Sequence, residues 1–173
     1  LHTLQLKGMF GENDPLKIIG AAKIKELVWH EDAFAIGFNF GLFTSLVKLD
    51  MSVEKPGGYR NGSFMSSTNA LLLLEELNMR NNLLARNGDN GNVTTLDLSW
   101  QARLKSLDVQ GTGITRLRLA TGAPIVRLCL PNTLEELFLE YLTKLPESGL
   151  VLEGINNITG YRFVGCPGID GFS

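Results

Sequence analysis

The sequence predicts a repeat solenoid with a parallel β-sheet face and little helix. Between Val93 and Leu139 a short unit recurs five times, with an aliphatic residue at its first, fourth and sixth places. The fourth and sixth side chains of such a unit lie on one face of a strand, and the first can reach the same core. Recurrence this regular is typical of a repeat array. The fourth-place residues, called anchors below, are spaced 9 to 11 residues apart: Leu96, Leu107, Leu117, Leu128 and Leu137.

Composition bounds the class of protein. The 173 residues are 44% hydrophobic and 20% charged, with a formal net charge of −2. These values fit one continuous solenoid over 1–173 and argue against a polybasic nucleic-acid binder. The sequence has no run of 18 apolar residues and therefore predicts no membrane span. Two cysteines, Cys129 and Cys166, do not make a disulfide framework, and we expect both to be free thiols.

Weaker copies of the unit flank the regular block. Their anchors are Leu4, Leu27, Leu49, Leu77 and Tyr161. Alternate anchors through the whole chain, with Leu96, Leu117 and Leu137 in the middle, are about 22 residues apart on average. We expect these alternate anchors to form one continuous strand wall. Because the chain begins inside a repeat, we also expect it to be part of a longer protein whose export signal lies outside it.

The Leu-x-x-Leu-x-Leu cores resemble those of leucine-rich repeat proteins over nearly the whole chain. The half period of 9 to 11 residues resembles a subtype in surface proteins of gut anaerobes and their bacteriophages. The resemblance implies an α/β-type right-handed solenoid of about eight turns, with Leu107, Leu128 and the segment 150–152 on the opposite wall. The family also places Asn or Cys inside the turn after each strand. Only Asn82 and Cys166 match this, so we expect other polar groups or water to satisfy the remaining turn backbone.

The segments between the strands follow from turn and cap residues. Asp14 followed by Pro15 predicts a short helix start, and residues 67–77 are expected to hold a helical turn before their strand. Residues 52–68 contain Pro, Gly and Asn and predict an insertion loop, which is either a tolerated insertion or a contact surface. The tail 165–173 is turn-rich and is expected to be a frayed end or a linker.

Strand alternation predicts which side chains face outward from the sheet. A rigid array of outward side chains loses little entropy on docking and suits a large partner, although the same charges also keep a solvated sheet face soluble. We expect a ligand-binding patch at Asp50, Asn78, Arg80, Asp97, Arg118 and Phe138.

The aromatic residues of the central turns suggest a second type of ligand. Trp100, Phe138 and Tyr141 are expected near the edge of the sheet, where sugar rings could stack on them, with structural packing as the alternative. Trp29 occupies a sixth place and is expected in the core.

Catalytic and metal sites find little support in the sequence. The cluster His30–Asp32 lies on successive strand positions, whose side chains point to opposite faces. No zinc-protease motif, Cys-x-x-Cys pair or serine nucleophile elbow occurs. We therefore expect no catalytic residues, no metal, no cofactor and no enzymatic activity.

The sequence thus favours a non-enzymatic recognition or adhesion module of a larger exported bacterial protein. It would bind protein, or a glycan, through its strand face at the cell surface or after secretion, and would be monomeric or self-associate end to end. The alternative is a structural or receptor-contacting component of a bacteriophage virion.

Overall fold

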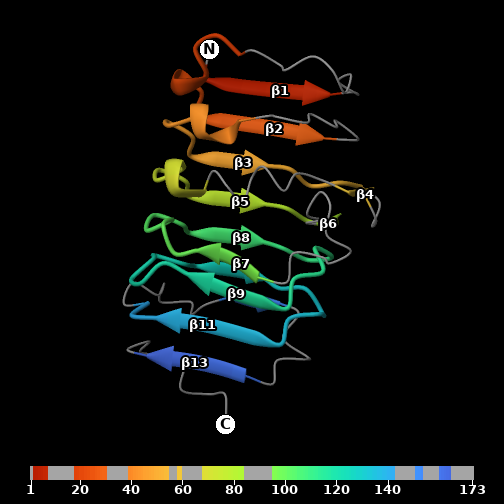
Figure 1. The fold of residues 1–173 in the computed structure, drawn as a ribbon, viewed down its shortest axis with the longest axis vertical. Helices are drawn as coiled ribbons and strands as arrows, with labels where there is room; N and C mark the ends of the chain where they lie inside the picture. The colour runs from red at the N-terminus through yellow and green to blue at the C-terminus, as the bar shows by residue number, and fades with distance from the viewer. Residues whose placement is uncertain are drawn as a thin grey trace.

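The computed structural model describes residues 2–7, 18–30, 39–54, 58–59, 68–83, 95–142, 151–153 and 160–164. They form a β-solenoid of about four turns with almost no helix. The strands lie one above the next from β1 at one end of the stack to β13 at the other (Figure 1). The expected parallel sheet and low helix content are confirmed.

Seven strands form one continuous parallel sheet, with their anchors in register. In spatial order they are β1 (Thr3–Lys7), β2 (Glu26–His30), β3 (Lys48–Asp50), β5 (Glu76–Asn78), β8 (Ser106–Asp108), β10 (Arg127–Cys129) and β12 (Val151–Glu153). The paired anchors are Leu4, Leu27, Leu49, Leu77, Leu107, Leu128 and Leu152.

A second parallel sheet of four strands forms the opposite wall. Its order is β13 (Gly160–Val164), β11 (Glu136–Glu140), β9 (Arg116–Leu119) and β7 (Thr95–Leu98). In Figure 1, β9, β11 and β13 cross the view in the opposite direction to β1, β2 and β3. The chain therefore runs forward along one wall and back along the other.

The remaining described elements are short. Three 3-10 helices, η1 (Ala21–Lys23), η2 (Phe40–Leu42) and η3 (Thr68–Ala70), each precede a strand of the seven-stranded sheet. The helix η3 confirms the helical turn expected within 67–77. Inside the expected insertion loop, β4 (Gly58–Tyr59) pairs in parallel with β6 (Asn82–Leu83).

The expected assignment of anchors to walls is wrong after Leu77. The seven-stranded sheet continues from Leu77 to Leu107, whereas Leu96 opens the four-stranded sheet. The step from Leu77 to Leu96 is 19 residues, close to the average full turn, but it spans only half a turn. Extra residues in a connection cost little free energy, so spacing alone does not reveal which half turn is long. The expected number of eight turns is likewise wrong, since the solenoid has about four.

The core lies between the walls and consists mainly of leucine. The anchors Leu77, Leu107 and Leu128 are at most 2% exposed. Trp29 is 4% exposed and packs against Phe40 with ring centroids 5.9 Å apart, which confirms its expected core position. Each buried leucine contributes about 1.5–3 kcal/mol, too little for one turn to fold alone, so neighbouring turns must share the core.

Buried polar side chains satisfy backbone groups inside the turns. The Asn82 amide donates to the Met51 carbonyl over 2.9 Å, which confirms the role expected of this asparagine. The Gln101 amide donates to the Thr68 carbonyl over 2.5 Å. The expectation that polar groups other than Asn satisfy backbone groups of the turns is thus confirmed for Gln101.

Several expectations fall outside the described residues. They are the helix start near Asp14, the cluster His30–Asp32 except for the backbone of His30, Cys166 and the tail 165–173. None of the helices in the described part of the chain is long and apolar enough to cross a membrane.

Candidate functional site

The structure divides the six expected ligand-binding residues between the two sheets. Asp50 and Asn78 are paired in register on β3 and β5, and Arg80 follows at the end of β5. Asp97 and Arg118 are paired in register on β7 and β9, and the next residue in that row is the remaining expected one, Phe138 on β11. Each group of three is therefore brought together, but the two groups lie on separate walls.

Several of these side chains form the turn that ends their strand. The side-chain oxygens of Asp50, Asn78 and Asp97 accept hydrogen bonds from the backbone N–H two residues later, over 2.9, 3.1 and 2.9 Å. Such Asx turns explain why Asp or Asn occupies these positions without any role in ligand binding.

Asp108 makes the same turn and was missed as a site residue. Its carboxylate accepts from the Gln110 N–H over 3.1 Å, and it pairs in register with Asn78. The signal was present in the sequence, since Asp108 follows its anchor as Asp50 and Asp97 follow theirs. It was overlooked because its strand was assigned to the opposite wall.

The outer face of the seven-stranded sheet contains a shallow depression of about 330 Å³, lined by residues of β2, β3, β5, β8 and β10. We call it the acidic depression. Asp108 is only 8% exposed and is the one charged residue among the buried residues that the structure describes. The charged and amide side chains of its lining are Glu26, Lys48, Asp50, Glu76, Asn78, Asp108 and Arg127.

Negative charge is in excess in the acidic depression, where four carboxylates meet two basic groups. Lys48 lies 3.0 Å from Glu76, whose hydrogen bond and charge hold the pKa of Lys48 above its ordinary value. Arg80, two residues past β5, lies 3.8 Å from the Asp108 carboxylate. Glu26 faces Lys48 in register, and its charge also raises the pKa of Lys48. Asp50 has no ion pair with Lys or Arg in the described part of the chain, so its charge adds to the negative character of the depression.

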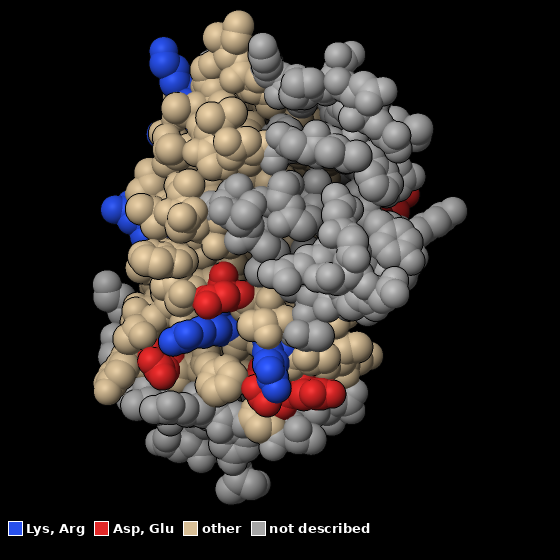
Figure 2. All heavy atoms as spheres, in the orientation of Figure 1, with Lys and Arg blue, Asp and Glu red and all other residues tan. Residues whose placement is uncertain are grey.

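The outer face of the four-stranded sheet carries compensated charge instead. Figure 2 shows Lys, Arg, Asp and Glu side chains gathered over the lower part of the molecule, where Figure 1 places β9 and β11. Arg116 pairs with Glu136 over 2.9 Å, and Arg118 stands beside Asp97 in register. Alternating signs of this kind keep a sheet face solvated and leave little net attraction for a charged partner.

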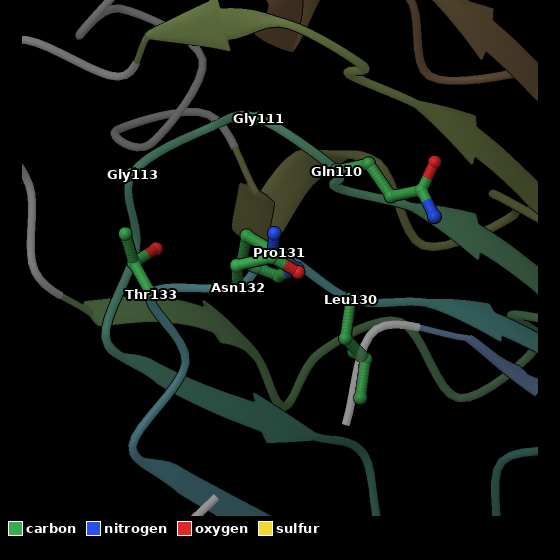
Figure 3. A pocket seen from close by; sticks show the side chains of 7 residues that line it. All are labelled: Gln110, Gly111, Gly113, Leu130, Pro131, Asn132 and Thr133. Atoms are coloured by element: carbon green, nitrogen blue, oxygen red, sulfur yellow. The ribbon is translucent and has the colours of Figure 1, made fainter. Parts of the chain in front are cut away.

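A larger hollow of about 490 Å³ lies between two successive turns, at the segments Gln110–Gly113 and Leu130–Thr133. Figure 3 shows these two segments side by side, with the Gln110 side chain extending away from Asn132. Among the described residues, its lining has no titratable side chain, and Leu130 and Pro131 are buried. It is larger than the acidic depression but offers less chemistry, so we favour the depression as the site.

Metal binding and thiol chemistry find no site in the described residues. No group of three or more His, Cys, Asp or Glu side chains there could hold a metal ion. Cys129 on β10 is fully buried and forms no disulfide within the described part of the chain. Comparison with models of known protein families, with curated proteins and with solved structures finds no match to this chain. The function proposed below therefore comes from the surface chemistry and the repeat pattern.

Proposed function

We propose that the chain is a leucine-rich repeat solenoid, wound right-handed, that works as a non-enzymatic recognition module. The support is the repeated Leu-x-x-Leu-x-Leu unit, whose anchors stack in register through the seven-stranded sheet. Side chains on such a sheet are held by a rigid backbone and lose little conformational freedom when a partner docks. The module belongs to a larger exported protein that acts at the bacterial cell surface.

The partner is a protein segment that presents lysine or arginine side chains to the acidic depression. The observation that carries this proposal is the excess of carboxylates in the acidic depression, four against two basic groups, with Asp50 in no ion pair among the described residues. Asp50 and Asp108 lie in one row on strands that are two apart in the sheet, about 10 Å, so the basic groups of one extended segment can reach both. A cation placed there gains attraction, and complementary charge also speeds encounter and fixes register.

The experiment measures binding of an extended peptide with lysine at alternate positions, by calorimetry at low and at physiological salt. The same peptide with acetylated lysines is the matched ligand without charge. We expect saturable binding of the lysine peptide alone, weakening as salt rises because surface charges are screened within about 8–10 Å.

The double variant Asp50→Asn and Asp108→Asn tests the depression without disturbing the turns, because asparagine keeps the oxygen that each turn needs. Each removed charge is worth about 0.2–1 kcal/mol, so we expect the Kd to rise by about 2- to 30-fold. Asp97→Asn makes the same exchange in the same type of turn on the other sheet and is the control. Equal weakening by Asp97→Asn would contradict the site. End-to-end assembly of the chain without any peptide binding would favour the virion component instead.

A further inference from the structure

Two large aromatic side chains are exposed at one edge of the four-stranded sheet. Trp100 is 60% exposed and Tyr141 is 50% exposed. By contrast, Trp29, Phe40 and Phe43 are at most 4% exposed, so the fold has ample room to bury aromatic rings where packing requires them. Exposure of Trp100 and Tyr141 at the same edge is a separate feature from the acidic depression on the other wall.

The sheet places the two residues at the same end of its strands. Trp100 follows the end of β7 by two residues and Tyr141 follows the end of β11 by one, and β7, β9 and β11 are parallel. Trp100 and Tyr141 therefore lie beyond the same ends of strands that are two apart in the sheet. Two strand spacings are about 10 Å.

The backbone holds Tyr141 in an unusual conformation. Its φ is +53°, in the left-handed region that bulky residues rarely adopt. Strained conformations of this kind are concentrated at functional sites, where the surrounding structure sets the direction of a side chain. Glycine would fit this position without strain, so the turn itself does not explain a tyrosine here.

The residues just past β9, the strand between β7 and β11, have no large side chain: they are Ala120, Thr121 and Gly122. Gly122 has a φ of +72°, and the nearest atom to a Cβ added there would be the Tyr141 carbonyl oxygen, 3.7 Å away. Beside it, the Thr121 hydroxyl hydrogen-bonds to the Glu140 carboxylate over 3.3 Å. The edge thus alternates an apolar ring, an open polar gap and a second apolar ring.

We propose that this aromatic edge binds a polysaccharide chain, with one sugar ring on each aromatic side chain. A sugar ring has an apolar face of C–H groups and a periphery of hydroxyls, which fits aromatic surfaces separated by hydroxyl and carboxylate groups. The hot spot of a protein–protein interface would instead require a contiguous, desolvated apolar centre. The inference is independent of the proposed protein partner, because the two sites lie on different walls.

The tryptophan content makes a direct assay possible. The chain has two tryptophans, and Trp29 is 4% exposed, so Trp100 accounts for the fluorescence that iodide can quench. The probes are soluble β-glucan, xylan and mannan, each titrated into the protein. We expect one of them to shift the emission to the blue and to protect it from iodide, with saturation.

Variants then separate binding from folding. Trp100→Ala, followed by affinity electrophoresis in a gel that contains the polysaccharide, should weaken binding by about tenfold or more. Tyr141→Gly should weaken it similarly while raising the melting temperature, because glycine relieves the left-handed backbone. Leu72→Ala, which removes a side chain that is 50% exposed elsewhere, is the control and should leave the affinity unchanged.

The opposite results would overturn the proposal. They are no change of fluorescence with any of the three polysaccharides, or full affinity in Tyr141→Gly. Concentration-dependent self-association that disappears in Trp100→Ala would identify the edge as a contact between copies of the chain instead.

Discussion

Gly111 should tolerate no side chain, since it lies in close contact with a residue of the preceding turn. Its φ is +71°, and a Cβ added there would lie 2.6 Å from the Asn81 side-chain oxygen and 3.2 Å from the Asn81 Cα. Asn81 belongs to the preceding turn of the same wall, and its amide donates to the Val53 carbonyl over 3.1 Å. Gly111→Ala therefore strains its own turn and disturbs the bond between Asn81 and the turn before.

The magnitude follows from two contributions. A residue with a Cβ in the left-handed region costs about 1–2 kcal/mol relative to glycine. Displacing the Asn81 side chain loses a hydrogen bond worth about 1 kcal/mol. We expect Gly111→Ala to lower the free energy of unfolding by about 2–3 kcal/mol.

Urea unfolding measures this loss, and Gly122→Ala is the matched control. Gly122 has nearly the same φ, +72°, but its added Cβ would meet no atom closer than 3.7 Å. The control should cost only the backbone strain, about 1–2 kcal/mol. In addition, Asn81→Ala combined with Gly111→Ala should cost about 1 kcal/mol less than the two single changes added together, because both remove the same hydrogen bond.

The reasoning would be refuted if Gly111→Ala and Gly122→Ala destabilised the protein equally. It would also be refuted if the double variant were fully additive. Either result would mean that the contact between Gly111 and Asn81 contributes nothing to the packing of successive turns.

Two further predictions concern the polar residues Asn82, on β6, and Lys48, on β3. Asn82→Ala should lower the free energy of unfolding by about 1–3 kcal/mol, because it leaves the buried Met51 carbonyl without its donor; an unchanged urea midpoint would contradict this. Lys48→Met should shift the midpoint much less at pH 7, since the Lys48–Glu76 pair is about half exposed. The pKa of Lys48 is raised in the folded protein. The stabilising contribution of Lys48 is therefore fully present below its pKa in the unfolded chain and is lost as pH rises through its pKa in the folded protein. Urea unfolding curves of the wild type and of Lys48→Met at alkaline pH would check this.

The repeat unit was sufficient to predict the parallel strands and most of the core. Alternation places Leu107 and Leu128 inward whichever wall they belong to, because an inward position depends only on the pattern within the unit. The same holds for Trp29, which the sixth place of its unit predicts to be buried. Burial is a local property of the repeat and can therefore be predicted from the sequence.

Membership of a wall is not local, and this is why the predicted binding patch was divided. The near-full-turn spacing between Leu77 and Leu96 predicts that Asp97 and Arg118 lie beside Asn78. The long turn between β5 and β8 shifts the assignment by half a turn and brings Asp108 into the row instead. A shift of this kind depends on how the connection folds, which no residue pattern in the strands records.

The row of Asx turns shows which part of the acidic depression the fold itself requires. Asp50, Asn78 and Asp108 occupy equivalent positions on successive strands, and each accepts a hydrogen bond from the backbone two residues later. Asn78 makes this turn with a neutral side chain, so the turn requires only an oxygen acceptor. The negative charges of Asp50 and Asp108 are therefore not needed to end their strands. Arg80 lies 3.8 Å from the Asp108 carboxylate, whereas Asp50 has no ion pair in the described part of the chain. A negative charge that neither its turn nor a neighbouring cation explains, as at Asp50, is what recognition of a cationic partner would require.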